Sequence, residues 1–320
     1  MFKRLTAVVV LSLSCAVSAF AAYPTATVTI IVPFPAGQAG DLIARLLGSE
    51  LSNRLGQAFV IENKPGAGGR VGTALAARAK NDGYTLLMTS TGPFAIAPAL
   101  YADTIQYDPL KDFVGIAEAA ATPQILAVSN HSGIQSIQQL IQQAKSQDLS
   151  YASAGSGSTQ HLTMELLKIK FGIPMVHVPF KGSPESKTQI MSGLIPVTSD
   201  SLPPILPQIK ASQMKALAVI DVERSPYLPD VPTLAELGYP GIASVAFFGL
   251  VAPKGTPVEA INILNKNILE ILKLPAVQEK FKEQALTLPK PRDAAEFNKY
   301  LTAEVAKWKK IVVDSNVKVE

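Results

Sequence analysis

The sequence predicts an α/β protein with two lobes that face a shared cleft. Apolar, β-branched runs alternate with helical patterns along the chain, which indicates parallel sheets. Two segments, 28–55 and 150–168, each have the pattern of a strand, a loop of small residues and a helix. With 320 residues, of which 48% are hydrophobic and 17% charged, the chain can form two ordinary domains. Ligands bind beyond the carboxyl ends of strands in such sheets, so the two loops predict a ligand between the lobes.

The N-terminus has the pattern of a secretory signal peptide. A positive region at 3–4 precedes an apolar stretch from 7 to 17, and Ala-Phe-Ala at 19–21 is a typical cleavage site. The apolar stretch is too short to span a bilayer core of about 30 Å. Cys15, the single cysteine, could be a lipoprotein attachment site, but the Leu of a lipobox is missing three positions before it. We expect residues 1–21 to be removed, which leaves a mature chain without cysteine chemistry.

The charge pattern indicates neither a nucleic-acid partner nor a membrane span. The formal net charge is +4 and the pI about 9.0, but no run of five Lys or Arg residues occurs. Binding driven by phosphate contacts needs a clustered basic face. After the signal region no segment has 18 uncharged apolar residues, so we expect no transmembrane helix.

The first half of the chain begins with a predicted strand over 28–34, an apolar run rich in Val and Ile. A turn at 35–40 follows, and leucines and isoleucines on one side predict a helix at about 41–55. The elements expected next are a strand at 59–63, a glycine-rich loop at 65–69, a helix through 74–79, a turn at 81–83 and a strand at 84–88.

The second half repeats this alternation. The expected elements are strands at 125–128, 150–153, 176–180 and 216–220, a helix that begins at Ser136 with a capping box to Gln139, and a helix after a loop at 154–158. Towards the C-terminus, Thr256 is predicted to cap a helix whose first residue is Pro257. Asp293 with Glu296 predicts the start of the last long helix.

The turn at 34–41 is the first candidate ligand site. Gly37 and Gly40 let backbone N–H groups approach a ligand, and the helix that begins here favours an anion. Asp41 could cap that helix, and the alternative is a tight turn without a ligand. No Lys-Ser or Lys-Thr follows the glycines, so the turn is not a P-loop.

The loop at 154–158 is the second candidate site, because its small residues offer N–H and hydroxyl donors before a helix. Ser158 or Thr159 can also act simply as a helix cap. Ser158, His161 and Asp200 together could suggest a hydrolase, but neither serine near the helix lies in a G-x-S-x-G elbow. We interpret His161 as a hydrogen-bonding residue near the cleft, since the other histidines show no metal-ligand spacing with it.

Other polar positions lie near the ends of predicted strands. Residues 90–92 offer donors at the same sheet edge as the first turn, and Thr122 precedes the strand expected to cross between the lobes. Asp200 could accept from a ligand hydroxyl or amine, or merely end a strand. The loop at 65–69 lacks the third Gly of a dinucleotide fingerprint, because Val71 stands there, and we interpret it as structural.

Motifs along essentially the whole mature chain match one family in one order. The matching stretches are IVPFPAG (31–37), ENKPGAGG (62–69), DGYTLL (82–87), YDP (107–109) with KDF (111–113), SAGSGS (153–158) with HL (161–162), HVPFKG (177–182), LPDVPT (228–233) and APKGTP (252–257). On these motifs the sequence resembles the Bug receptors, the substrate-binding (TctC-like) components of tripartite tricarboxylate transporters. The motifs are specific for the family, though not for one ligand.

The resemblance implies a type II periplasmic-binding-protein fold, with the ligand in the cleft between two hinged lobes. The first lobe would contain 23–124 and 247–320, and the second 125–246. The family's ligand carboxylate is expected near the first turn, held partly through ordered waters. Taken together, the residues and the resemblance give these candidate ligand-binding residues: Phe34, Pro35, Ala36, Gly37, Gln38, Asp41, Ser90, Thr91, Gly92, Thr122, Ser153, Gly155, Ser156, Gly157, Ser158, His161 and Asp200.

Three positions depart from the family pattern. Gln38 replaces the second Gly of the usual Pro-Ala-Gly-Gly, so a side-chain amide could contact the ligand or displace a water. Phe180 stands where Tyr is common, and Phe247 where Trp is common. The first departure bears on the carboxylate geometry, and the other two on the preferred ligand shape.

We therefore expect a protein that captures a small organic carboxylate in the periplasm for a tripartite tricarboxylate transporter, without catalysis. The expected partners are that carboxylate and membrane transport subunits or a sensor protein, with no nucleic acid. We expect a monomer that needs no cofactor and no metal. The alternatives are an extracytoplasmic carboxylate sensor without transport partners and a secreted hydrolase that uses Ser158 and His161.

Overall fold

The computed structural model describes residues 23–317, so the expected signal peptide at 1–21 lies outside the described residues. None of the helices within 23–317 combines the length and hydrophobicity that a membrane span requires.

The strands are β1 (Val28–Val32), β2 (Phe59–Asn63), β3 (Thr85–Ser90), β4 (Phe113–Ser129), β5 (Ser150–Ser153), β6 (Val176–Pro179), β7 (Val197–Ser201), β8 (Met214–Ile220) and β9 (Val245–Pro253). The α-helices are α1 (Ala39–Leu55), α2 (Arg70–Ala77), α3 (Ala97–Leu100), α4 (Pro109–Asp112), α5 (Ile137–Ser146), α6 (Thr159–Phe171), α7 (Ser183–Met191), α8 (Leu202–Lys210), α9 (Val258–Ile271), α10 (Pro275–Glu283) and α11 (Ala294–Ser315). Short helical turns occur at η1 (Ala67–Gly69), η2 (Gly92–Ile96) and η3 (Asn130–Ser132).

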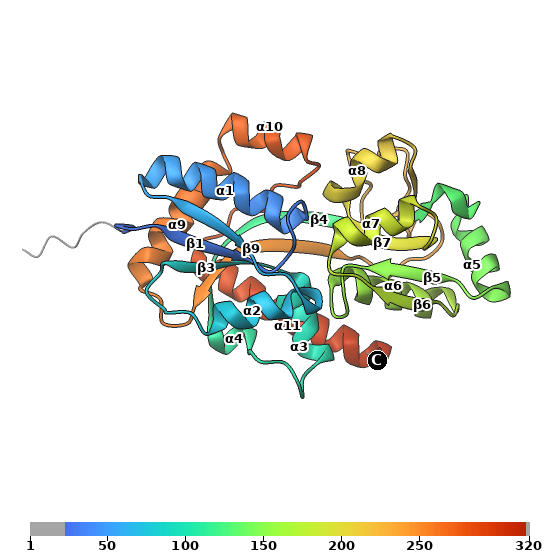
Figure 1. Ribbon diagram of the computed structural model, residues 1–320, viewed down its shortest axis with the longest axis horizontal. Helices are drawn as coiled ribbons and strands as arrows, with labels where there is room; N and C mark the ends of the chain where they lie inside the picture. Colours follow the sequence, from blue (N-terminus) through green and yellow to red (C-terminus); the bar gives the residue numbers. More distant parts are fainter. Residues whose placement is uncertain (1–22, 318–320) are drawn as a thin grey trace, which may run out of the picture.

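Two lobes share the long strand β4. The strands join in the order β2-β1-β3-β9-β4-β7-β5-β6, and β8 also pairs with β4. The first part of β4 pairs antiparallel with β9, and its second part pairs antiparallel with β7 and β8. Figure 1 shows β4 and β9 running through the middle of the molecule, with α1 and α9 on one side and α5 and β6 on the other. We call the part around β1 the first lobe and the part around β5 the second lobe.

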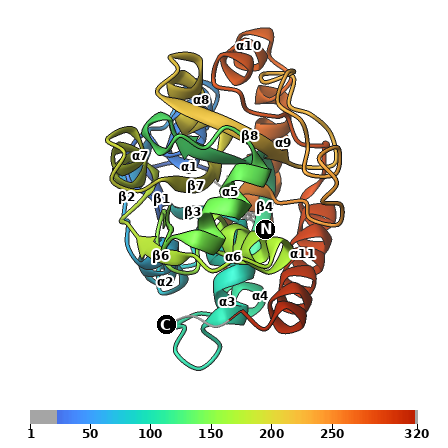
Figure 2. The same ribbon diagram turned by 90° about the vertical axis from the view of Figure 1, so that its right-hand side faces the viewer.

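The two lobes repeat one strand arrangement. In the first lobe, β1 lies between its parallel partners β2 and β3, and β9 is inserted antiparallel between β3 and β4. In the second lobe, β5 lies between its parallel partners β6 and β7, and β4 is inserted antiparallel between β7 and β8. The two predicted strand–loop–helix units are therefore β1–α1 and β5–α6, at equivalent places. Figure 2 views the molecule from the second-lobe end, with α5 and α6 in front.

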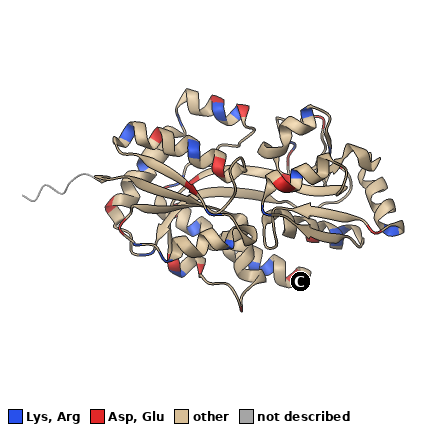
Figure 3. Cartoon of the chain, viewed as in Figure 1, with Lys and Arg blue, Asp and Glu red and all other residues tan. Residues whose placement is uncertain are grey.

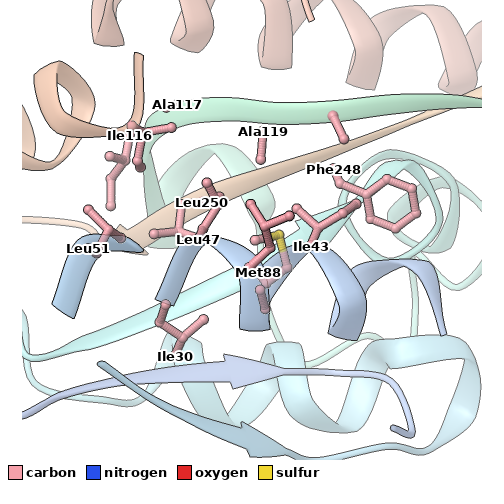
Figure 4. Close-up of a cluster of buried hydrophobic side chains, with 14 of the residues drawn as sticks. Ile30, Ile43, Leu47, Leu51, Met88, Ile116, Ala117, Ala119, Phe248 and Leu250 are labelled. Atoms are coloured by element: carbon pink, nitrogen blue, oxygen red, sulfur yellow. The ribbon is translucent and has the colours of Figure 1, made fainter. Parts of the chain in front are cut away.

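Each lobe has its own hydrophobic core. In the first lobe, Ile43 and Leu47 lie one helical turn apart on α1 and face Met88 of β3 (Figure 4). In the second lobe, Tyr151 and Leu167 belong to a separate cluster of buried side chains. Full burial of a side chain of this size contributes roughly 1.5–3 kcal/mol. These cores make each lobe a rigid support for the loops that face the cleft.

Several predicted boundaries differ from the structure. Helix α1 begins at Ala39 rather than near Asp41, because extended backbone ends only at Gln38 (φ −80°, ψ 156°). The second helix covers 70–77 rather than 74–79, and the strand expected at 125–128 is the second part of β4.

Of the caps predicted at Ser136, Thr256 and Asp293, the first and last are found; Ser158 also caps α6, whereas Gln38 rather than Asp41 precedes α1. Thr256 does not cap α9: its hydroxyl donates to the Pro253 carbonyl oxygen, and the helix begins at Val258. The capping box of Asp293 and Glu296 is confirmed. Ser136 accepts from the N–H of Gln139, although the Gln139 amide returns to residue 135 rather than to the cap itself.

Candidate functional site

A small cavity lies between the two lobes. Its lining residues are Phe34, Gln38, Gly68, Ser90, Gly92, Pro93, Ser158, Thr159, Gln160, Ser201, Ala246 and Phe248. The cavity volume is about 10 Å³, which is space for about one water molecule. Because both lobes contribute to the lining and so little space remains, this is a closed arrangement of the lobes.

The cavity lies where several helices begin. Gln38 precedes α1, Ser158 precedes α6, and Ser201 precedes α8. The first N–H groups of a helix have no partner within the helix, and the helix dipole adds positive potential there. Within the described residues 23–317, the lining includes no Lys or Arg. An anion in this cavity would therefore be held by N–H and hydroxyl groups rather than by a formal charge.

The lining has a polar side and an apolar side. Ser90, Ser158, Thr159 and Ser201 contribute hydroxyl groups. The Ser158 oxygen already accepts from the His161 N–H, and the Ser201 oxygen accepts from Gln124, so both hydroxyl protons remain available for a ligand. The apolar side includes Phe34 and Phe248. A few polar groups set against aromatic rings suit a carboxylate on a hydrocarbon body.

Asp41 holds the first turn in shape. Its carboxylate accepts from the Gly37 N–H at 2.9 Å, from Arg45 Nε at 3.0 Å and from Asn63 Nδ2 at 2.9 Å. Burial alone would raise its pKa, but these hydrogen bonds hold the pKa of Asp41 below its usual value. The Gly37 N–H, one of the donors expected to bind the ligand, is therefore occupied within the turn.

Only part of the first turn reaches the cavity. Phe34 and Gln38 are lining residues. Pro35 is half-buried, and Ala36 and Gly37 are exposed on the outer side of the turn. These three predicted residues therefore do not line the cavity.

The loop at 153–158 is fixed by two histidines. Ser153 Oγ lies 2.7 Å from His177 Nε2 and accepts from the Gly155 N–H. The Gly157 N–H donates to Nδ1 of His161 at 3.2 Å, and the two imidazole rings stack with centroids 4.0 Å apart. Burial lowers the pKa of His161 to about 4 and that of His177 to about 3, so both rings are neutral at pH 7.

Asp200 lies behind the cavity wall and is fully buried. Its carboxylate accepts from Gln160 Nε2 and Ser183 Oγ, both at 2.9 Å, and from the Ser201 N–H at 2.7 Å. Burial raises the pKa of Asp200 to about 6, although these hydrogen bonds oppose the shift.

Ser158, His161 and Asp200 do not form a catalytic relay within the described part of the chain. The Ser158 hydroxyl accepts from the backbone of His161 rather than from its imidazole, and the Asp200 carboxylate bonds other side chains. Likewise, no group of three His, Cys, Asp or Glu side chains within 23–317 is placed to hold a metal ion.

Two of the remaining predicted residues contact backbone rather than the cavity. The Thr91 hydroxyl accepts from the Phe247 N–H at 3.0 Å, which joins η2 to β9. The Thr122 hydroxyl contacts the Pro123 carbonyl oxygen at 3.5 Å on β4. Phe247 itself is buried against Phe94 and does not line the cavity.

Seven lining residues are absent from the sequence-based candidates: Gly68, Pro93, Thr159, Gln160, Ser201, Ala246 and Phe248. Gly68 belongs to the loop that the sequence suggests is structural. A Cβ at Gly68 would lie 2.6 Å from the Ser156 carbonyl oxygen of the second lobe. Its role depends on a contact between lobes, for which the local sequence carries no signal.

A wider hollow lies between the two lobes. It has a volume of about 350 Å³ and includes Arg70 from the first lobe and Lys181 from the second. Gly155, Ser156 and Phe180 also line it, together with Glu185. Elsewhere charges of both signs are scattered over the two lobes (Figure 3). With two cations and one carboxylate, the lining of this hollow carries a net positive charge.

Comparison with known proteins places the chain in a family. Residues 43–317 match the model of the "Tripartite tricarboxylate transporter family receptor". The chain is 34% identical to protein BugT of Bordetella pertussis over 301 residues, which are 93% of this chain and 92% of BugT. The periplasmic binding protein BugD has a TM-score of 0.88 at 31% identity, covering 93% of this chain and 100% of BugD. R. palustris Rpa4515, solved with adipate, has a TM-score of 0.88 at 33% identity, covering 92% of this chain and 99% of that protein. The match over residues 43–317 and the identity to BugT over 93% of the chain show that the chain belongs to the TctC family of tripartite tricarboxylate transporter receptors, to which the Bug proteins also belong.

Proposed function

We propose that this protein captures a small organic carboxylate in the periplasm and passes it to the membrane subunits of a tripartite tricarboxylate transporter. The observation that carries the proposal is the cavity between the lobes, lined by hydroxyl groups and helix starts on one side and by aromatic rings on the other. The adipate in the R. palustris relative supports the carboxylate class.

The proposed mechanism is capture by closure. Donors from Gln38 and Ser90 on the first lobe and from Ser158 and Thr159 on the second meet one ligand only when the lobes are closed. The ligand then shifts the balance between open and closed forms by its preference for the closed one. A charge-assisted hydrogen bond contributes about 1.5–3 kcal/mol, and a micromolar site needs about 8 kcal/mol, so a few such bonds are enough.

The finer assignments belong to the same proposal. Residues 1–21 act as an export signal, and the lobe boundaries lie near 124 and 246. The protein acts as a monomer whose closed form docks on the membrane subunits. An extracytoplasmic sensor would use the same capture step, and transporter genes beside this gene would favour uptake over sensing.

The test is a thermal-shift screen of residues 22–320, refolded to remove carried-over ligand, against mono-, di-, tri- and aromatic carboxylates. At 100 times its Kd a ligand should add about 2.7 kcal/mol of stability. Thr159→Val, which removes a lining hydroxyl at nearly constant shape, should reduce the shift, whereas Thr302→Val on the exposed face of α11 should not. A stabilising shift with neutral solutes alone would contradict the carboxylate assignment.

A further inference from the structure

Gln38 of the first lobe reaches across the cleft to the second lobe. It is the last residue before α1, lines the cavity and is only 7% exposed. Its Oε1 accepts from the backbone N–H of Ser183 at 3.4 Å. Ser183 is the first residue of α7, so a side chain of one lobe meets a helix start of the other.

The contact with Ser183 fixes which end of the Gln38 amide faces the ligand. A backbone N–H can only donate, so the amide oxygen must point towards Ser183. The Nε2 group then points away from Ser183. No hydrogen bond joins Nε2 to residues 23–317, and Nε2 is not one of the fully enclosed atoms without a partner, so it faces the open space of the cavity that Gln38 lines. A donor that faces the cavity can bond to water or to an oxygen of a ligand.

The surrounding atoms leave the amide little freedom in the closed form. Gly182 packs so closely that a Cβ there would lie 2.3 Å from Pro35 Cγ and 2.9 Å from Gln38 Oε1. The amide therefore occupies a fixed part of the cleft, next to a cavity of about 10 Å³. Because this space suits about one water, any diacid requires the lobes to move apart from this arrangement, and a long chain requires more separation than a short one.

We propose that Gln38 is a specificity-determining residue: it donates through Nε2 to an oxygen of the bound carboxylate, and its bulk favours short ligands over long ones. Both effects require lobes that close around the ligand far enough to bring Gln38 near Ser183, which orients the amide. This inference rests on the proposed carboxylate function and specifies how the same site selects its ligand.

The test compares two probes, malate as a short diacid and adipate as a long one, by calorimetric titration of the refolded mature chain. Gln38→Glu keeps an oxygen for Ser183 but replaces the donor with a negative charge, so the Kd for malate should rise at least about tenfold. Gln38→Gly removes the bulk, so the ratio of adipate Kd to malate Kd should fall by about tenfold. Melting temperatures of the ligand-free variants report whether they are folded.

A pair of variants at Ser183 tests the orienting contact. Ser183→Pro removes the N–H at a position where helices accept proline, whereas Ser183→Ala keeps the N–H and loses only the hydroxyl. The Kd for malate should be about two- to tenfold weaker in Ser183→Pro than in Ser183→Ala.

Three results would overturn the inference. The first is Gln38→Glu binding malate within twofold of the wild type, and the second is an unchanged adipate-to-malate ratio in Gln38→Gly. The third is equal affinity of the two Ser183 variants. A wild type that binds neither probe and no other carboxylate would instead refute the proposed function, and the inference with it.

Discussion

Replacing Gly68 by Ala should keep the lobes from closing fully. A Cβ at this position would lie 2.6 Å from the carbonyl oxygen of Ser156 and 3.1 Å from the backbone nitrogen of Ser158. Both atoms are backbone atoms of the second lobe, so no side chain can rotate away. A tolerable contact of at least 3.0 Å requires the lobes to separate by about 0.4 Å at this point. The bond between Gln38 and Ser183, already 3.4 Å long, would then be lost or weakened.

The expected loss of affinity can be separated from backbone strain. Gly68 has φ 65°, and Gly172 in the second lobe has φ 61° with nothing within 4 Å of a Cβ. Gly172→Ala therefore carries similar strain, on the order of 1 kcal/mol, without a clash between lobes. The loss of an interlobe hydrogen bond and of close packing should cost about 1.4 kcal/mol in the closed form, which is a tenfold weaker Kd.

The assay is a calorimetric titration of both variants with malate. Gly68→Ala should bind malate about tenfold more weakly than Gly172→Ala. If the two variants bind within twofold of each other, the closed contact at Gly68 does not control binding and the reasoning is refuted.

Three further predictions follow from the buried polar groups. Burial raises the pKa of Asp200 to about 6, above its ordinary 3.8, so the folded state holds the proton more tightly and the free energy of unfolding should fall as pH rises from about 4 to about 6. Asp200→Asn should abolish this fall in denaturant titrations at the two pH values. His161→Ala removes the acceptor for the Gly157 N–H and should lower the free energy of unfolding by about 1–3 kcal/mol, measured by thermal melting. The rate of ester hydrolysis should be the same for this variant and the wild type, because His161 does not act as a catalytic base. Arg292→Ala leaves the buried Glu118 carboxylate without its ion-pair partner and should cost about 2–3 kcal/mol in denaturant unfolding, below the range for a fully buried pair because Arg292 is partly exposed.

The local sequence predicts the first strands of each lobe well, because their patterns are local. The runs at 28–32 and 150–153 are short and apolar, and each is followed by a loop of small residues and a helix. No strand is predicted for β9, which pairs with residues more than a hundred positions away. Helix α8 is also missed, because it contains three prolines: two occupy its first turn, where no N–H is needed, and Pro207 lies inside it.

The site is predicted only in part, for the same reason. The two candidate loops do meet at the cleft, as glycines and hydroxyl residues before helices suggest. Which residues face inward depends on contacts that the sequence does not display. Gly37 and Asp41 bond each other across the turn, whereas Gly68 and Phe248 reach the cavity from distant segments.

The position of β9 has a consequence for the order in which the chain can fold. In the sheet of the first lobe β9 separates β3 from β4, although both of those strands precede it by well over a hundred residues. A nascent chain that ends before residue 245 cannot bridge this gap, because its β3 and β4 have nothing to pair with on their facing edges. Helices α9 and α11, which pack against β4, are made later still. During synthesis, the lobe whose residues emerge first is therefore the one completed last.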